Sequence, residues 1–187
     1  MRKIIIIAVF IVIISAGCTD IKKEYSEDVS LLLEEFNRQI NIMSNEYIRM
    51  IESGDADTDL GNVQKILYDI KLDLLSLKQP QDEEYRNFTS KFLTTIESFE
   101  LLNYKISNYA SLYRERQDIG QDGIKGFSRK DKIIKEKMSV TDNLIEIQRE
   151  DIRSTASKCK YNLTDLAGSA VRMLDVKLEF PEFLISL

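Results

Sequence analysis

Apolar residues recur along most of this chain at steps of three and four, and few residues interrupt them. Only seven glycines and two prolines stand among its 187 residues. Side chains three and four apart lie on one face of an α-helix, so these stripes predict amphipathic helices that each bury one side. Strands would need strict alternation, and no strand-rich region is found, so long helices packed side by side are the expected fold.

The first two helices have recognisable ends. The first is expected over 26–53, with the Ser26 side chain as its N-terminal cap. The second is expected over 59–78, where apolar residues follow a heptad pattern. Pro80 stops this helix, because the residue before a proline avoids helical backbone angles.

The third helix is expected after Asp82, and it carries an aromatic stripe. The aromatic residues are Tyr85, Phe88, Phe92, Phe99, Tyr104, Tyr109 and Tyr113. Helical spacing favours core packing for these rings, and the alternative is a groove that takes an apolar ligand.

The fourth helix is expected to begin near Ser128 and Asp131, which resemble a capping pair. Polar residues interrupt its apolar stripe at helical spacing, at Thr141, Gln148 and Thr155. They either bond to one another inside the protein or mark a face left open for a partner. The pattern does not decide whether this helix continues past Gly168.

Together the stripes predict an all-α fold, an antiparallel four-helix bundle with long coiled-coil-like helices and a short extended C-terminal tail. The bundle domain is expected over 26–178 and the apolar tail over 179–187. Cys159 falls on the apolar stripe of the fourth helix and is expected to be a small buried core residue.

The first 18 residues form a separate segment. A short basic stretch, Arg2 and Lys3, precedes an apolar run from Ile4 to Ile14, which is shorter than the roughly 20 residues of a membrane-spanning helix. Ala16, Gly17 and Cys18 follow, with Ser15 at the place where an apolar residue is usual. This segment resembles the signal peptide of bacterial lipoproteins, whose lipobox ends at the cysteine that receives lipid.

The resemblance implies a signal peptide over 1–17, a diacylglyceryl group on Cys18, and a short tether over 18–25. The protein would then be lipid-anchored to the cell membrane on its extracytoplasmic face, with fatty chains such as palmitate. Two acyl chains hold a protein stably, whereas one does so only marginally. Thr19 after the cysteine leaves the outer membrane possible in a cell that has one. The alternatives are an ordinary secretory signal and an uncleaved anchor.

Composition excludes several chemistries. Histidine is absent, which excludes the usual Ser-His-Asp and Cys-His catalytic sites and histidine-ligated metal sites. The net charge of −5 argues against nucleic-acid binding, which demands positive charge. We therefore expect a protein that is not an enzyme, holds no cofactor and binds no nucleic acid.

A weak calcium pattern lies between the first two helices. Asp55, Asp57 and Asp59 alternate like the first ligands of an EF-hand loop. The sixth and twelfth places of that loop hold Leu60 and Ile66 instead of glycine and glutamate. A solvated turn is therefore the expected structure, and no metal is expected.

Two segments are candidate partner contacts. The first is a glycine-rich loop with basic neighbours, made of Gly120, Gly123, Lys125, Gly126, Arg129 and Lys130. The second is the apolar tail, through Phe180, Phe183 and Leu184. We expect a lipid-anchored interaction or structural module at the cell envelope, with a protein partner that the sequence does not identify. The alternative is a lipoprotein that binds or carries an apolar small molecule in an aromatic-lined groove.

Overall fold

The chain folds into a bundle of long α-helices in a computed structural model. The structure describes the backbone of 2–54, 60–123 and 130–185, and the side chains of 21–54, 60–120 and 133–184. The helices of the described residues are α1 (Arg2–Ser53), α2 (Gly61–Ser76), α3 (Glu83–Gly123), α4 (Lys130–Leu174) and α5 (Glu182–Ile185). The expected all-α bundle is confirmed.

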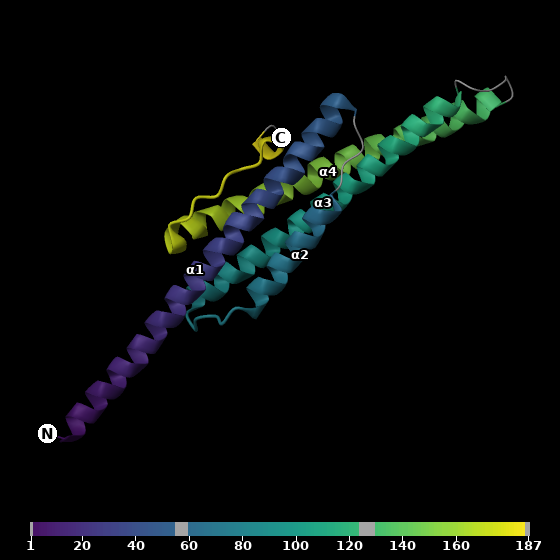
Figure 1. Cartoon of the computed structure of the whole chain (residues 1–187). Helices are drawn as coiled ribbons and strands as arrows, with labels where there is room; N and C mark the ends of the chain where they lie inside the picture. Colours follow the sequence, from purple (N-terminus) through teal and green to yellow (C-terminus); the bar gives the residue numbers. More distant parts are fainter. Residues whose placement is uncertain (1, 55–59, 124–129, 186–187) are drawn as a thin grey trace.

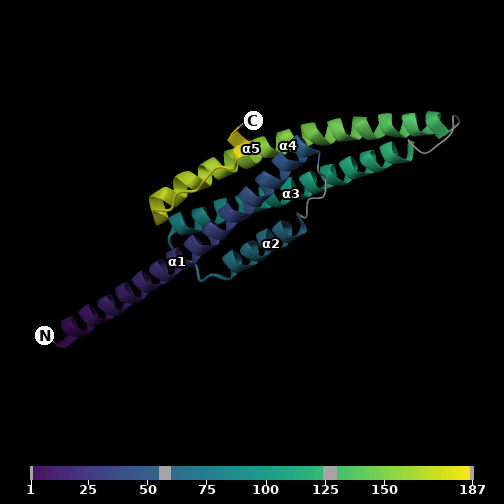
Figure 2. The same ribbon diagram turned by 45° about the horizontal axis from the view of Figure 1, so that its top comes forward.

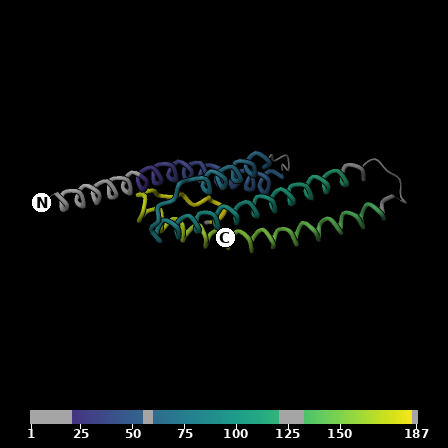
Figure 3. The backbone as a smooth tube through the Cα atoms, turned by 90° about the horizontal axis from the view of Figure 1, so that it is seen from below, coloured from purple at the N-terminus to yellow at the C-terminus, as the bar shows by residue number. Residues whose placement is uncertain are grey.

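The helices form an elongated rod (Figure 1). The most extensive packing joins α3 to α4, and α1 and α2 pack on each other and on α3. Figure 3 shows α1 and α2 together on one side of α3 and α4. The hairpin of α3 and α4 runs past the C-terminal end of α1 (Figure 2). The third helix is therefore the central element of the bundle.

Aromatic rings of α1 and α3 make the centre of the core. Phe36 meets Phe92 and Phe99 edge to face, with ring centroids 5.5 Å and 5.4 Å apart. All three side chains are fully buried. Edge-to-face contacts of this kind add to the stabilisation from apolar burial. The aromatic stripe of the third helix therefore packs as core at these positions.

The first helix does not begin at Ser26 as the sequence predicted. Ser26 lies inside α1, and its hydroxyl donates a hydrogen bond to the carbonyl of Lys22 at 2.8 Å. A serine inside a helix can bond in this way to the carbonyl four residues back. The buried stripe of this helix starts at Tyr25, as its apolar spacing predicts, and the Tyr25 ring packs against Tyr85.

Two other boundaries differ from expectation. The second helix covers Gly61–Ser76 rather than 59–78, because Leu77 is already extended. The third helix includes Gly120 and Gly123, which were expected in a loop. A glycine inside a helix costs about 1 kcal/mol relative to alanine, and the long contact with α4 offsets that cost.

The fourth helix continues through Gly168 to Leu174, which answers the question left open by the sequence. Asp175 then takes a left-handed backbone conformation, with φ of 55°, and the chain reverses. The tail runs back between α1 and α4 (Figure 3) and ends in the single turn α5. The expected extended tail is thus extended only as far as Pro181.

Phe36→Ala is expected to lower the free energy of unfolding by about 3–5 kcal/mol, because it leaves a cavity among buried rings. Leu31 on the same helix is 65% exposed. Leu31→Ala is the matched control and should change stability by about 0.5 kcal/mol or less. Urea unfolding followed by circular dichroism measures both, and equal effects would contradict this core.

Candidate functional site

The tail residues expected as a contact surface are mostly inside the protein. Phe183 and Leu184 are 4% and 0% exposed, and Phe180 packs partly buried against the core. The Phe183 ring lies 5.7 Å from that of Tyr47 on α1. This part of the prediction is wrong, because the apolar tail covers its own bundle instead of offering its side chains to a partner.

The glycine-rich loop is only partly described. Gly120 and Gly123 lie in the last turns of α3, and Lys130 is the first residue of α4. Three further candidates, Lys125, Gly126 and Arg129, lie outside the described residues. A role for this end of the hairpin in partner contact stays a prediction.

The remaining candidates also fall outside the described side chains. The calcium candidates Asp55, Asp57 and Asp59 belong to a segment that the structure does not describe, and Cys18 lies in α1 with its side chain outside the described set. Among the side chains that are described, no cluster of three or more carboxylates or thiols is arranged to hold a metal ion. No helix in the described part of the chain has the length and apolar character needed to cross a membrane.

A repeated polar cross-link joins α3 to α4. The Lys105 ammonium lies 2.7 Å from a carboxylate oxygen of Asp151 and donates to the Thr155 hydroxyl at 2.7 Å. That hydroxyl in turn donates to the backbone carbonyl of Asp151 at 2.8 Å. A lysine on one helix is thus held by an aspartate and a hydroxyl one turn apart on the other.

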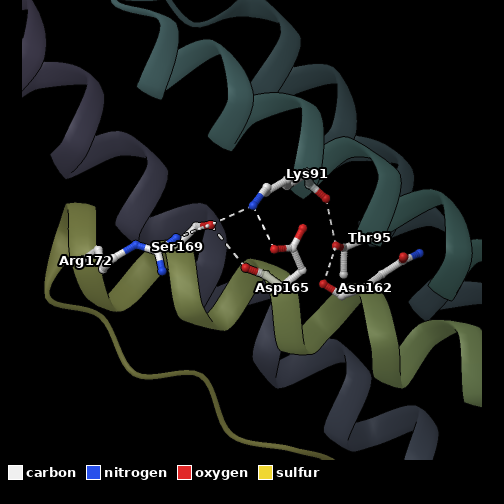
Figure 4. Close-up of polar contacts among 6 residues, drawn as sticks. All are labelled: Lys91, Thr95, Asn162, Asp165, Ser169 and Arg172. Atoms are coloured by element: carbon white, nitrogen blue, oxygen red, sulfur yellow. Dashed lines mark hydrogen bonds and ion pairs between the residues drawn. The ribbon is translucent and has the colours of Figure 1, made fainter.

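The same arrangement recurs two heptads away along both helices (Figure 4). Lys91 lies 2.7 Å from a carboxylate oxygen of Asp165 and donates to the Ser169 hydroxyl at 3.3 Å. Ser169 donates to the carbonyl of Asp165 at 3.1 Å and accepts a hydrogen bond from Arg172 at 3.4 Å. The repeat fixes the antiparallel register of the two helices.

The lysine, serine and aspartate of this network do not form a nucleophilic site. A serine nucleophile needs a neighbouring base that accepts its proton. The Ser169 hydroxyl instead donates to a backbone carbonyl, and Lys91 is ion-paired with Asp165 and donates to the serine. The repetition of the motif at Lys105 also fits a structural cross-link better than a single catalytic centre.

The polar interruptions of the fourth helix face α3. Thr141 and Thr155 are buried, and the Gln148 amide donates to the Lys105 carbonyl at 3.3 Å. The sequence left two possibilities for these polar residues. They could bond to one another inside the bundle, or they could lie on a face left open for a partner. Thr141 and Thr155 do lie inside and Gln148 is half-buried, but Gln148 and Thr155 bond across to α3.

Cys159 is a core residue, as the sequence predicted. Its side chain is 0% exposed, and its thiol donates to the Ser98 carbonyl at 3.2 Å. Burial raises the pKa of the thiol to about 12. A thiol that stays neutral in water of ordinary pH is a poor nucleophile, so Cys159 is inert in the folded protein.

A cleft of about 460 Å³ lies where α1, α4 and the tail meet. Its walls are Tyr47, Ile48, Ile51, Glu52, Arg149, Ile152, Arg153 and Phe183. Arg149 donates to the Tyr109 hydroxyl at 3.3 Å, and burial raises the pKa of Tyr47. The sequence pattern gives no sign of this cleft, because one of its walls is the tail, whose position depends on the fold.

A row of exposed residues follows one face of α4. We call it the outer stripe and define it as Ile133, Lys137, Val140, Leu144, Ile147 and Asp151. The four apolar members are 57%, 59%, 45% and 66% exposed, in that order. The sequence carries a signal for this row in the seven-residue spacing of Ile133, Val140 and Ile147.

Comparison with protein-family models, curated protein sequences and solved structures finds no significant match to this chain.

A double-mutant cycle at Lys91 and Asp165 should give a coupling energy of about 0.5–1 kcal/mol, because the pair links two helices and is partly shielded from water. The control is Arg153 with Glu150, a pair within α4 whose side chains are 55% and 62% exposed. This control cycle should give less coupling. Urea unfolding of Lys91→Met, Asp165→Asn and the double variant measures the first cycle. A larger coupling in the control would count against the cross-link.

Thiol reagents at pH 8 should fail to label Cys159 in the folded protein and should label it after unfolding, with Cys159→Ala as the blank. The pKa of about 12 lies above the reference value of 9, so an unfolded chain loses this proton first. Stability contributed by the neutral thiol is therefore complete below pH 9 and declines as pH rises toward 12. Fast labelling of the native protein would contradict the buried position.

Proposed function

We propose that this protein is a lipid-anchored extracytoplasmic lipoprotein that acts by contact, as a non-enzymatic interaction module of the cell envelope. The anchor rests on the signal segment that ends in Ala16, Gly17 and Cys18. Lipid attached to Cys18 would hold the chain at the cell membrane, or at the outer membrane in a cell that has one. The partner is a protein, and no nucleic acid takes part.

The outer stripe is the observation that carries the contact role. Four large apolar side chains stand exposed on one face of one helix, and contiguous exposed apolar surface is typical of protein interaction sites. The polar groups best placed for chemistry, around Lys91 and Lys105, are engaged in cross-links between helices. Contact is therefore better supported than catalysis.

The shape of the bundle supports a role at a distance from the membrane. Tyr25, at the start of the core, follows Cys18 closely in the sequence. The α3–α4 hairpin extends toward the opposite end of the rod (Figure 2). The 41 residues of α3 span about 60 Å at 1.5 Å per residue. A lipid at Cys18 would thus leave the hairpin end projecting away from the membrane.

Carriage of an apolar small molecule is the second candidate, and the cleft beside Tyr47 and Phe183 favours it. The groove expected near Phe92 and Phe99 is filled by packing against Phe36. A carrier would therefore use the cleft between α1, α4 and the tail.

Cys18→Ser is expected to abolish incorporation of labelled palmitate in a bacterial host and to shift the protein out of the membrane fraction. Cys159→Ala is the matched control and should keep both the label and the membrane location, since its thiol is buried in the core. Label incorporation and cell fractionation are the measurements. If Cys18→Ser stays equally membrane-bound and equally processed, the lipid anchor is wrong.

A further inference from the structure

The outer stripe has the geometry of a coiled-coil seam. Its members follow one another along α4 at steps of four and three, which keeps them on one face of the helix. Each of its last four members, from Val140 to Asp151, stands one residue before a residue that faces the bundle. Val140 precedes buried Thr141, and Leu144 precedes buried Ile145. One residue turns a helix by about 100°, so the apolar members of the outer stripe form a second face that the bundle leaves uncovered.

The charges of the outer stripe are arranged symmetrically about its centre. Lys137 stands seven residues before Leu144, and Asp151 stands seven residues after it. Val140 and Ile147 lie between each charge and the centre. Both charged residues are exposed, and the Asp151 side chain keeps 48% of its surface in solvent beside Lys105. Its carboxylate therefore has room for a second cation.

We infer that the outer stripe binds the same stripe of a second copy of this chain, with the two α4 helices antiparallel. A two-fold axis at Leu144 brings Lys137 of each copy against Asp151 of the other. It sets Val140 next to Ile147, one residue away from exact opposition. A parallel pair would place lysine on lysine and aspartate on aspartate. A two-fold contact uses one patch twice, so a self-complementary stripe is what it requires.

A comparison within the molecule supports a second copy as the partner. The helix α2 also exposes apolar residues at helical spacing, at Tyr68, Leu72 and Leu75. Lys65 precedes that row, and α2 ends at Ser76 directly after Leu75, so no charge of opposite sign follows the row on this helix. Of these two rows, the α4 row alone has opposite charges at its two ends, so it complements a second copy of itself in the antiparallel direction.

The inference rests on the proposed function as a contact module and names its partner. The paired segment from Lys137 to Asp151 is about 21 Å long, which gives a small interface and a dimer that forms with rising concentration. Antiparallel pairing places the N-terminal ends of the two chains at opposite ends of the pair. Copies anchored in two facing membranes would satisfy both that geometry and the lipid anchor.

Sedimentation, in detergent, of the full chain carrying Cys18→Ser tests the pairing of the α4 helices without any attached lipid. A failure of the pairing can therefore be distinguished from a failure of the lipid anchor. The mass should rise from monomer to dimer with concentration. Leu144→Glu should raise the dissociation constant by at least about tenfold, which is about 1.4 kcal/mol. Leu72→Glu is the matched control, because Leu72 is 46% exposed and Leu144 45%. A monomer at every concentration, or equal effects of the two variants, overturns the inference.

Disulfide trapping tests the orientation in the same Cys18→Ser chain, where the remaining thiol, Cys159, is buried. Leu144→Cys should form a covalent dimer under mild oxidation, because the two residues meet on the axis. Lys137→Cys alone should not, since its two copies lie far apart in the antiparallel pair. A mixture of Lys137→Cys and Asp151→Cys chains should form the mixed dimer. Cross-linking of Lys137→Cys as fast as that of Leu144→Cys indicates parallel pairing and overturns the inference.

Discussion

The register between α3 and α4 is the constraint on which the rest of this structure depends. It is set by two copies of one motif, in which a lysine of α3 is held by an aspartate and a hydroxyl one turn apart on α4. A partly exposed ion pair contributes little energy by itself. Two such pairs at matching positions nevertheless disfavour sliding of the helices, because a shifted register breaks the ion pairs and hydrogen bonds of both lysines together.

Once this hairpin is fixed, the other elements take their places on it. Aromatic burial attaches α1 to α3 through Phe36, and an ion pair 2.6 Å long between Lys71 and Glu100 joins α2 to α3. The tail then fills the space between α1 and α4, where the Phe183 ring meets Tyr47. The face of α4 that carries Val140, Leu144 and Ile147 receives no element of the chain, and these side chains stay exposed. The same arrangement that completes the core thus leaves a surface for contact.

Much of this fold followed from periodicity. The apolar steps predicted four long helices and the buried position of Cys159, because helical spacing alone decides which residues share a face. Helix ends were predicted less well. Ser26 has the side chain of a helix cap but lies inside α1, and Gly120 lies inside α3 although glycine disfavours helices. In both cases the helix continues through the residue despite a local preference of about 1 kcal/mol.

The sequence by itself determined the class of fold, the absence of histidine chemistry and the resemblance of the first 18 residues to a lipoprotein signal. These depend on residue type and local order, which need no knowledge of distant contacts. The tertiary structure decided that Phe183 and Leu184 are covered and that Leu144 is exposed. All three are large apolar residues, so their chemistry could not distinguish them. Their burial depends on where the C-terminal tail and the helices around α4 lie in the folded chain. Those positions are fixed only when the whole chain packs.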